Sequence, residues 1–178
     1  MAARKSAVST PDEVVEENVS VIEDKPLSMD EKVTLRNLAG WMVGFNKLET
    51  VGQVNIDAKG VARISRGEVV AQAENGNRLI AGLDGMGSHA SILIDDKATR
   101  RYLGFEDDNR EQKIISEKLL KEIFEEKDEE TFKSRISDLI KTRHEREAVK
   151  DIISKNNLED NTSYSRIKFV KDLCRVRF

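Results

Sequence analysis

The fold is decided by residues 52–95, which read GQVNIDAKGVARISRGEVVAQAENGNRLIAGLDGMGSHASILID. Short apolar alternations in this stretch are separated by turn sequences, and three of the six residues from Gly82 to Gly87 are glycine. Alternation with a period of two predicts β-strands with one buried face. Asn75-Gly76 favours a tight β-hairpin, because both residue types accept the positive φ angles of such turns. We therefore predict a compact β unit.

The strands predicted by this pattern are residues 41–45, 54–56, 61–65, 68–74, 78–81 and 89–94, with turns at 57–60 and 66–67. Five or six short strands at close spacing favour a small antiparallel β-barrel or sandwich over an open sheet, whose edges would need covering. Upstream, Ser28-Met29-Asp30-Glu31 matches a capping box. Either a short helix or a first strand is expected to follow it, through Leu38.

Beyond Asp108 the apolar period becomes helical. Four amphipathic stripes at helical spacing lie at residues 119–124, 132–140, 148–153 and 167–174, which predicts a small helical bundle. Asp95-Asp96 is expected to cap a short helix over residues 97–103, ended by Gly104. The predicted class is α+β: a β-rich domain at 28–105 followed by a charged helical domain at 106–178.

Residues 1–27 are predicted to form an extended acidic arm, since their scattered apolar side chains are too few to offset the entropy of ordering. Residues 1–30 hold three basic and seven acidic groups, while the whole chain of 178 residues has a net charge of −3. No run of about 18 apolar residues and no apolar region after Arg4-Lys5 is present, so we expect neither a membrane span nor a secretory signal. Cys174 is the only cysteine, which excludes an internal disulfide and a multi-cysteine zinc site.

The loop 82–89 is the first candidate for binding, with Asp84, Gly85, Gly87, Ser88 and His89 as its residues. Glycine-rich loops bind phosphate when their amides converge before a helix N-terminus. Here a strand pattern follows, and no Gly-Lys-Ser/Thr is present, so the loop is interpreted first as a turn and second as a binding loop for a partner or ligand.

The two histidines, His89 and His144, are expected to have solvated or hydrogen-bonded structural roles. His89 could form an acid–base pair with Asp84 or Asp95, but no serine or cysteine nucleophile has a recognisable context nearby. We therefore predict no catalytic residue, no metal ligand and no cofactor.

Two basic groups are candidates for nucleic-acid binding. Arg63, Arg66 and Arg78 would share a face if the predicted hairpins pair, and the C-terminal segment carries Arg175 and Arg177. The β unit has few exposed aromatic side chains on which bases could stack, so this interpretation is the less favoured one. The basic C-terminus is expected to dock on an acidic surface, such as that of a neighbouring subunit.

The sequence resembles small proteins of unassigned role in tailed bacteriophages. The resemblance lies in Arg66–Gln72, Asn75-Gly76-Asn77, Asp84-Gly85, Gly87–Ala90 and Ile94-Asp95-Asp96, about 30 residues in all. It implies a virion or phage-assembly context and carries no residue roles.

The resulting hypothesis is a structural or assembly protein, not an enzyme, located in the cytoplasm or in a virion and bound to other protein subunits. The alternatives are a nucleic-acid-binding accessory protein and a small binding or inhibitor protein acting through the 82–89 loop.

Overall fold

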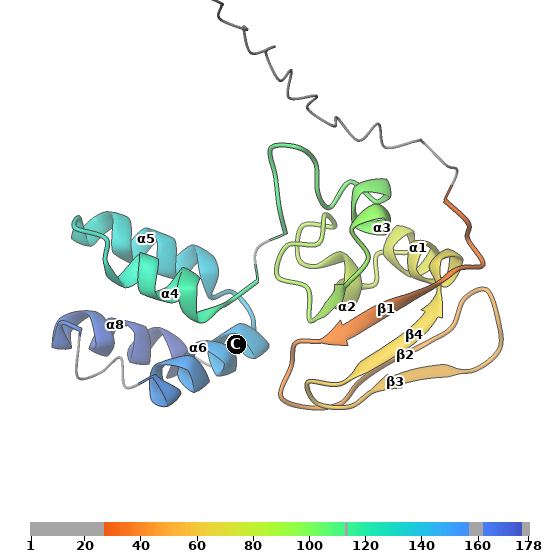
Figure 1. Ribbon diagram of the computed structural model, residues 1–178. Helices are drawn as coiled ribbons and strands as arrows, with labels where there is room; N and C mark the ends of the chain where they lie inside the picture. The colour runs from red at the N-terminus through yellow and green to blue at the C-terminus, as the bar shows by residue number, and fades with distance from the viewer. Residues whose placement is uncertain (1–26, 113, 157–161, 176–178) are drawn as a thin grey trace, which may run out of the picture.

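The computed structural model describes residues 27–112, 114–156 and 162–175. The predicted arm therefore lies outside the described residues except for Leu27. The elements are small antiparallel sheets with three short helices, followed by a group of helices, as Figure 1 shows. This confirms the α+β class.

Strand β1 (Lys32–Asn37) is central to the first sheet, whose order is β4-β1-β5. It pairs antiparallel with β4 (Val61–Ser65) and with β5 (Ile92–Ile94). Its Val33 and Leu35 are buried, and Leu35 lies opposite Ile94. Of the two alternatives left open after Ser28, the strand is the correct one.

Strands β2 (Val43–Asn46) and β3 (Gln53–Ile56) form a two-stranded antiparallel sheet. Phe45 lies opposite Val54, and both side chains are buried. Figure 1 shows this hairpin running along β4. Both sheets contribute to one hydrophobic core, drawn from residues between Val33 and Phe105. The described strands do not close into a barrel, so that prediction is wrong.

The barrel fails because residues 66–74 and 78–81 are helical. Helix α1 (Arg66–Glu74) replaces the predicted turn at 66–67 and the strand at 68–74, and α2 (Arg78–Ala81) replaces the strand at 78–81. Consecutive Val69 and Val70 are both buried, which a strand with one buried face does not allow. Asn75 is the C-cap of α1, so Asn75-Gly76 ends a helix and does not join two strands.

Helix α3 (Lys97–Tyr102) begins as predicted, with the Asp96 carboxylate accepting a hydrogen bond from the Thr99 amide at 2.8 Å. The C-terminal part contains α4 (Glu117–Phe124), α5 (Glu129–Leu139), α6 (Arg143–Lys155) and α8 (Tyr164–Arg175). Ser116 and Asp128 cap α4 and α5.

These four helices bury their stripes in a second hydrophobic core. Phe132 lies at its centre, with Phe124 and Phe169 at ring centroid distances of 5.6 and 6.3 Å. The guanidinium of Arg166 lies 4.6 Å from the centre of the Phe132 ring. The predicted stripes at 119–124, 132–140, 148–153 and 167–174 thus bury residues of this core.

Candidate functional site

The loop 82–89 is closed by a backbone hydrogen bond from the Leu83 amide to the Ser88 carbonyl, at 2.9 Å. The Asp84 carboxylate accepts hydrogen bonds from the amides of Met86 and Ser88, at 2.8 and 3.1 Å. Desolvation acts to raise the pKa of Asp84, although this residue is exposed, but hydrogen bonds from the Ser88 side chain and from the Met86 and Ser88 amides outweigh it and hold the pKa below its ordinary value. The amides that a phosphate would need are therefore used inside the loop. No helix N-terminus follows, because the chain continues to β5.

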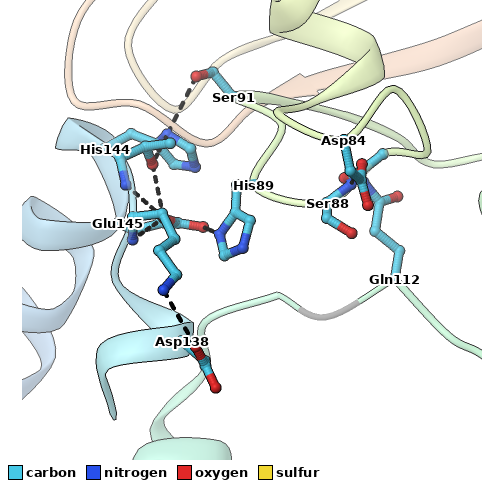
Figure 2. A network of polar contacts seen from close by, with 11 residues as sticks. Asp84, Ser88, His89, Ser91, Gln112, Asp138, His144 and Glu145 are labelled. Carbon is cyan, nitrogen blue, oxygen red and sulfur yellow. Dashed lines mark hydrogen bonds and ion pairs between the residues drawn. The ribbon is translucent and has the colours of Figure 1, made fainter. Parts of the chain in front are cut away.

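His89 joins this loop to the helical part of the molecule. Its Nδ1 lies 2.6 Å from Oε1 of Glu145, which stands in the first turn of α6. His89 has a φ of 62°, a left-handed backbone conformation that residues other than glycine rarely adopt. The predicted partners do not reach it, since Asp84 closes its own loop and Asp95 pairs with Arg36 at 2.7 Å. Figure 2 shows Glu145 turned toward the His89 ring.

The other oxygen of Glu145 caps α6. Oε2 accepts hydrogen bonds from the amides of Lys141 and Thr142 and from the Thr142 hydroxyl, at 2.9, 2.8 and 2.8 Å. Thr142 and Glu145 thereby form a capping box, with both oxygens of a buried carboxylate in use. The same side chain starts a helix and holds the glycine-rich loop.

His144 lies behind this pair and is buried, which the polar sequence around it did not indicate. Its Nδ1 is 3.1 Å from the Ser91 hydroxyl and 2.9 Å from the Thr142 hydroxyl (Figure 2). Burial is the largest cause that lowers the pKa of His144, and the charges of Lys59 and His89 lower it further, against Glu145. Both hydroxyls contact the same ring nitrogen, and no carboxylate among the described residues is hydrogen-bonded to the ring, as one is in a hydrolase triad.

A cleft of about 530 Å³ opens beside His89, between the 82–89 loop and helices α4 and α5. Its apolar wall is formed by Met86, Phe105, Leu119, Ile123 and Leu139. Polar side chains at its edge include those of His89, Arg110, Gln112 and Lys141. Gln112 donates a hydrogen bond through Nε2 to the Gly87 carbonyl at 2.7 Å, which fixes its amide against the loop.

The structure does not bring Arg63, Arg66 and Arg78 together on one surface. Arg66 is buried, where it pairs with Glu31 at 2.9 Å and with Asp96 at 3.3 Å. Arg63 and Arg78 are exposed on separate elements, β4 and α2.

At the C-terminal end, Arg175 is exposed and forms an ion pair with Asp172 at 3.6 Å, and Arg177 lies outside the described residues. The loop residues Asp84, Gly85, Gly87, Ser88 and His89 do lie together, because the Asp84 carboxylate accepts from the Met86 and Ser88 amides.

Sequence reasoning missed the residues that face the loop from the rest of the chain: Arg110 and Gln112 from the segment between α3 and α4, and Thr142 and Glu145 from the start of α6. A signal existed for two of these residues, because Thr142-Arg143-His144-Glu145 has the spacing of a capping box. No sequence pattern indicates that Arg110 and Gln112 approach the loop.

Within residues 27–112, 114–156 and 162–175, no group of three or more potential metal-ligating His, Cys, Asp or Glu side chains is found. No helix in the same ranges is long and apolar enough to cross a bilayer. The chain matches no family model, no curated protein and no solved structure.

Proposed function

We propose that this protein is a non-enzymatic assembly component that binds another protein subunit through the tip of the β2–β3 hairpin, residues 47–52. One observation carries the proposal. Val51 is fully exposed and Leu48 about half exposed, at 102% and 49% of their reference areas, on a tip whose backbone is held by a buried carboxylate. A single exposed apolar residue needs no explanation, but a pair on a fixed loop favours a contact surface.

Glu68 of α1 is the residue that holds this tip. Its two oxygens accept hydrogen bonds from the amides of Leu48 and Glu49 at 2.8 and 3.0 Å. Gln72, which donates to Glu68 at 2.9 Å, also donates to the Asn46 carbonyl at 2.6 Å. Because the tip is ordered before binding, little conformational entropy is lost when a partner contacts it.

The polar contacts around Glu145 support the same proposal. Thr142 and Glu145 use their polar atoms to cap α6, Glu145 also holds the loop, and His144 contacts the hydroxyls of Ser91 and Thr142. No nucleophile in the described ranges has a base on one side and an orienting carboxylate behind it. We take the assembly to be a bacteriophage virion or its precursor, on the resemblance of residues 66–96 alone.

The test compares native particles that contain the wild-type chain or the double variant Leu48→Asp/Val51→Asp. The variant is expected to leave the particle and to elute as a monomer of 20.1 kDa. Met42→Asp is the matched control, since Met42 is 60% exposed on the same domain and away from the tip. Retention of the double variant in the particle would refute the proposal.

A second candidate, nucleic-acid binding, is favoured by one face of α8. Tyr164, Lys168, Lys171 and Arg175 are spaced i, i+4, i+7 and i+11 and are all exposed, so they share one stripe. Cations bind phosphates and an exposed tyrosine can stack on a base. Lys168→Glu/Arg175→Glu should abolish retardation of a single-stranded 30-mer at low salt. Absence of retardation by the wild type eliminates this candidate.

A further inference from the structure

We propose that the cleft beside His89 binds the C-terminal residue of a polypeptide, an apolar residue with a free carboxylate. This site is separate from the hairpin tip, and the proposal does not depend on the assembly role. It rests on three features of the cleft: an unpaired guanidinium, an unpartnered amide oxygen and an apolar wall.

The guanidinium belongs to Arg110. Its Nη2 donates to the Gly104 carbonyl and its Nη1 lies 3.6 Å from the Met86 sulfur, so the head group is fixed in place. Within the described ranges no carboxylate forms an ion pair with it, and its Nε is a buried donor without a partner. The other cations of the cleft are paired: Lys141 with Asp138 at 3.2 Å and Arg135 with Glu122 at 2.7 Å. The cleft therefore favours a ligand with one negative charge.

The amide oxygen belongs to Gln112. Its Nε2 donates to the Gly87 carbonyl, and its Oε1 is buried with no hydrogen-bond partner among the described residues. A buried acceptor without a donor costs free energy, which a ligand N–H would recover. Arg110 and Gln112 are two residues apart and line the same cleft, so one ligand can contact both.

The wall of the cleft is apolar and preformed. Phe105 is buried and packs against Gly87, where an added Cβ would lie 2.8 Å from its ring. Leu119, Ile123 and Leu139 complete the wall from α4 and α5. A volume of about 530 Å³ lies within the range of sites that bind small ligands at domain junctions.

A C-terminal residue combines the three groups that these features require. Its carboxylate supplies a single anion for Arg110, its backbone amide supplies a donor for Gln112, and its side chain covers the apolar wall. A nucleotide fits poorly, because its several negative charges would meet a single arginine or lysine of the cleft that has no carboxylate partner among the described residues, Arg110. An internal peptide segment would leave Arg110 without a counter-charge.

The test measures binding of fluorescein-labelled octapeptides to the full chain by anisotropy. The peptides share a Gly-Ser sequence and end in Leu, Ile, Val or Phe, each as the free acid and as the C-terminal amide. We expect at least one free acid to bind, and its amide to bind about tenfold or more weakly, since charge-assisted hydrogen bonds are lost. Lack of binding by all four acids up to about 1 mM, a concentration that corresponds to about 4 kcal/mol of affinity, overturns the proposal.

The variant Arg110→Gln locates the contact. Free acid and amide should bind this variant equally, because the group that distinguishes them is absent. Arg78→Gln is the matched control, an exposed arginine on α2 outside the cleft, and should retain the full preference for the acid. A preference that persists in Arg110→Gln, or an amide that binds the wild type as well as the acid does, overturns the assignment.

Discussion

Arg66 shows how one buried charge organises the β-rich part. Its guanidinium donates to the Thr99 hydroxyl, to the Ser28 carbonyl and to the carboxylates of Glu31 and Asp96. The segment before β1, the start of α1 and the start of α3 are therefore held together by one side chain. Hydrogen bonds from the Thr99 amide and hydroxyl and from Arg66 hold the pKa of Asp96 below its ordinary value, although burial acts to raise it.

We expect Arg66→Met to lower the free energy of unfolding by about 2–3 kcal/mol, because the change removes the ion pairs with Glu31 and Asp96 and leaves the Ser28 carbonyl without its donor. The value lies at the lower end for a buried pair, since both carboxylates keep some contact with solvent. Urea unfolding followed by the fluorescence of the single tryptophan, Trp41, measures the loss. Arg78→Met should change it by less than about 0.5 kcal/mol, and equal effects of the two variants would contradict this account.

His144 gives a pH dependence with a defined sign. Burial lowers its pKa in the folded state below the ordinary 6.5, so the unfolded chain takes up a proton that the folded chain does not. Its contribution to stability is complete above about pH 6.5 and declines as the pH falls below that value. His144→Gln should therefore lose less stability than the wild type between pH 7.5 and pH 5.5, measured by urea midpoints. A loss as large as that of the wild type would show that other groups cause it.

At the scale of elements, helix capping distinguishes helix from strand at residues 66–74, where the apolar periodicity does not. Ser65-Arg66-Gly67-Glu68 has the same Ser-x-x-Glu spacing as Ser28–Glu31. Only Ser65 begins a helix, and its side chain accepts a hydrogen bond from the Glu68 amide. At Ser28–Glu31 the chain instead runs into β1, because Lys32–Asn37 pairs with two strands. The sequence of residues 66–74 alternates, but buried Glu68 and Gln72 hold the hairpin tip, a long-range contact that no local pattern contains.

The predictable part of the fold was the part with strong local signals. Strands at 43–46, 53–56 and 61–65 and the helices beyond Ser116 follow from alternation, caps and apolar stripes. The candidate site was predictable only on its loop side, through the glycines and His89. Its other side depends on Glu145 and Gln112, which lie 56 and 25 residues from their loop partners.

The loop itself gives a prediction that separates backbone strain from steric overlap. Gly85 and Gly87 have φ angles of 76° and 85°, so alanine costs about 1–2 kcal/mol at either position. A Cβ at Gly87 would also overlap Phe105, whereas no atom lies within 4 Å of one at Gly85. Gly87→Ala should therefore destabilise by about 1–3 kcal/mol more than Gly85→Ala. Urea unfolding of both variants measures the difference, and equal costs would contradict the close packing of Phe105.

For the molecule as a whole, the parts that hold the two hydrophobic cores are joined by several contacts, among them those of His89 with Glu145, of Ser91 with His144 and of the Arg143 guanidinium with the Trp41 ring. Each core is formed by its own segment of chain, one ending at Phe105 and the other beginning at Ile115. A charge-assisted hydrogen bond of 2.6 Å with one partner in each half restrains their relative motion. The cleft that we propose as a peptide site lies at the same junction, so its shape depends on this contact.

Two variants separate the joining role of Glu145 from its capping role. His89→Asn keeps a residue type that tolerates positive φ but is too short to reach Glu145, so α6 remains capped. Glu145→Ala removes both the contact and the cap, and the cap alone contributes about 1 kcal/mol.

Both variants should speed trypsin cleavage at Arg110, and Glu145→Ala should in addition lower the free energy of unfolding more than His89→Asn does. Glu130→Ala, which removes an exposed carboxylate on α5, should leave both unchanged. Cleavage of His89→Asn at the wild-type rate would show that the two halves are held together without the histidine.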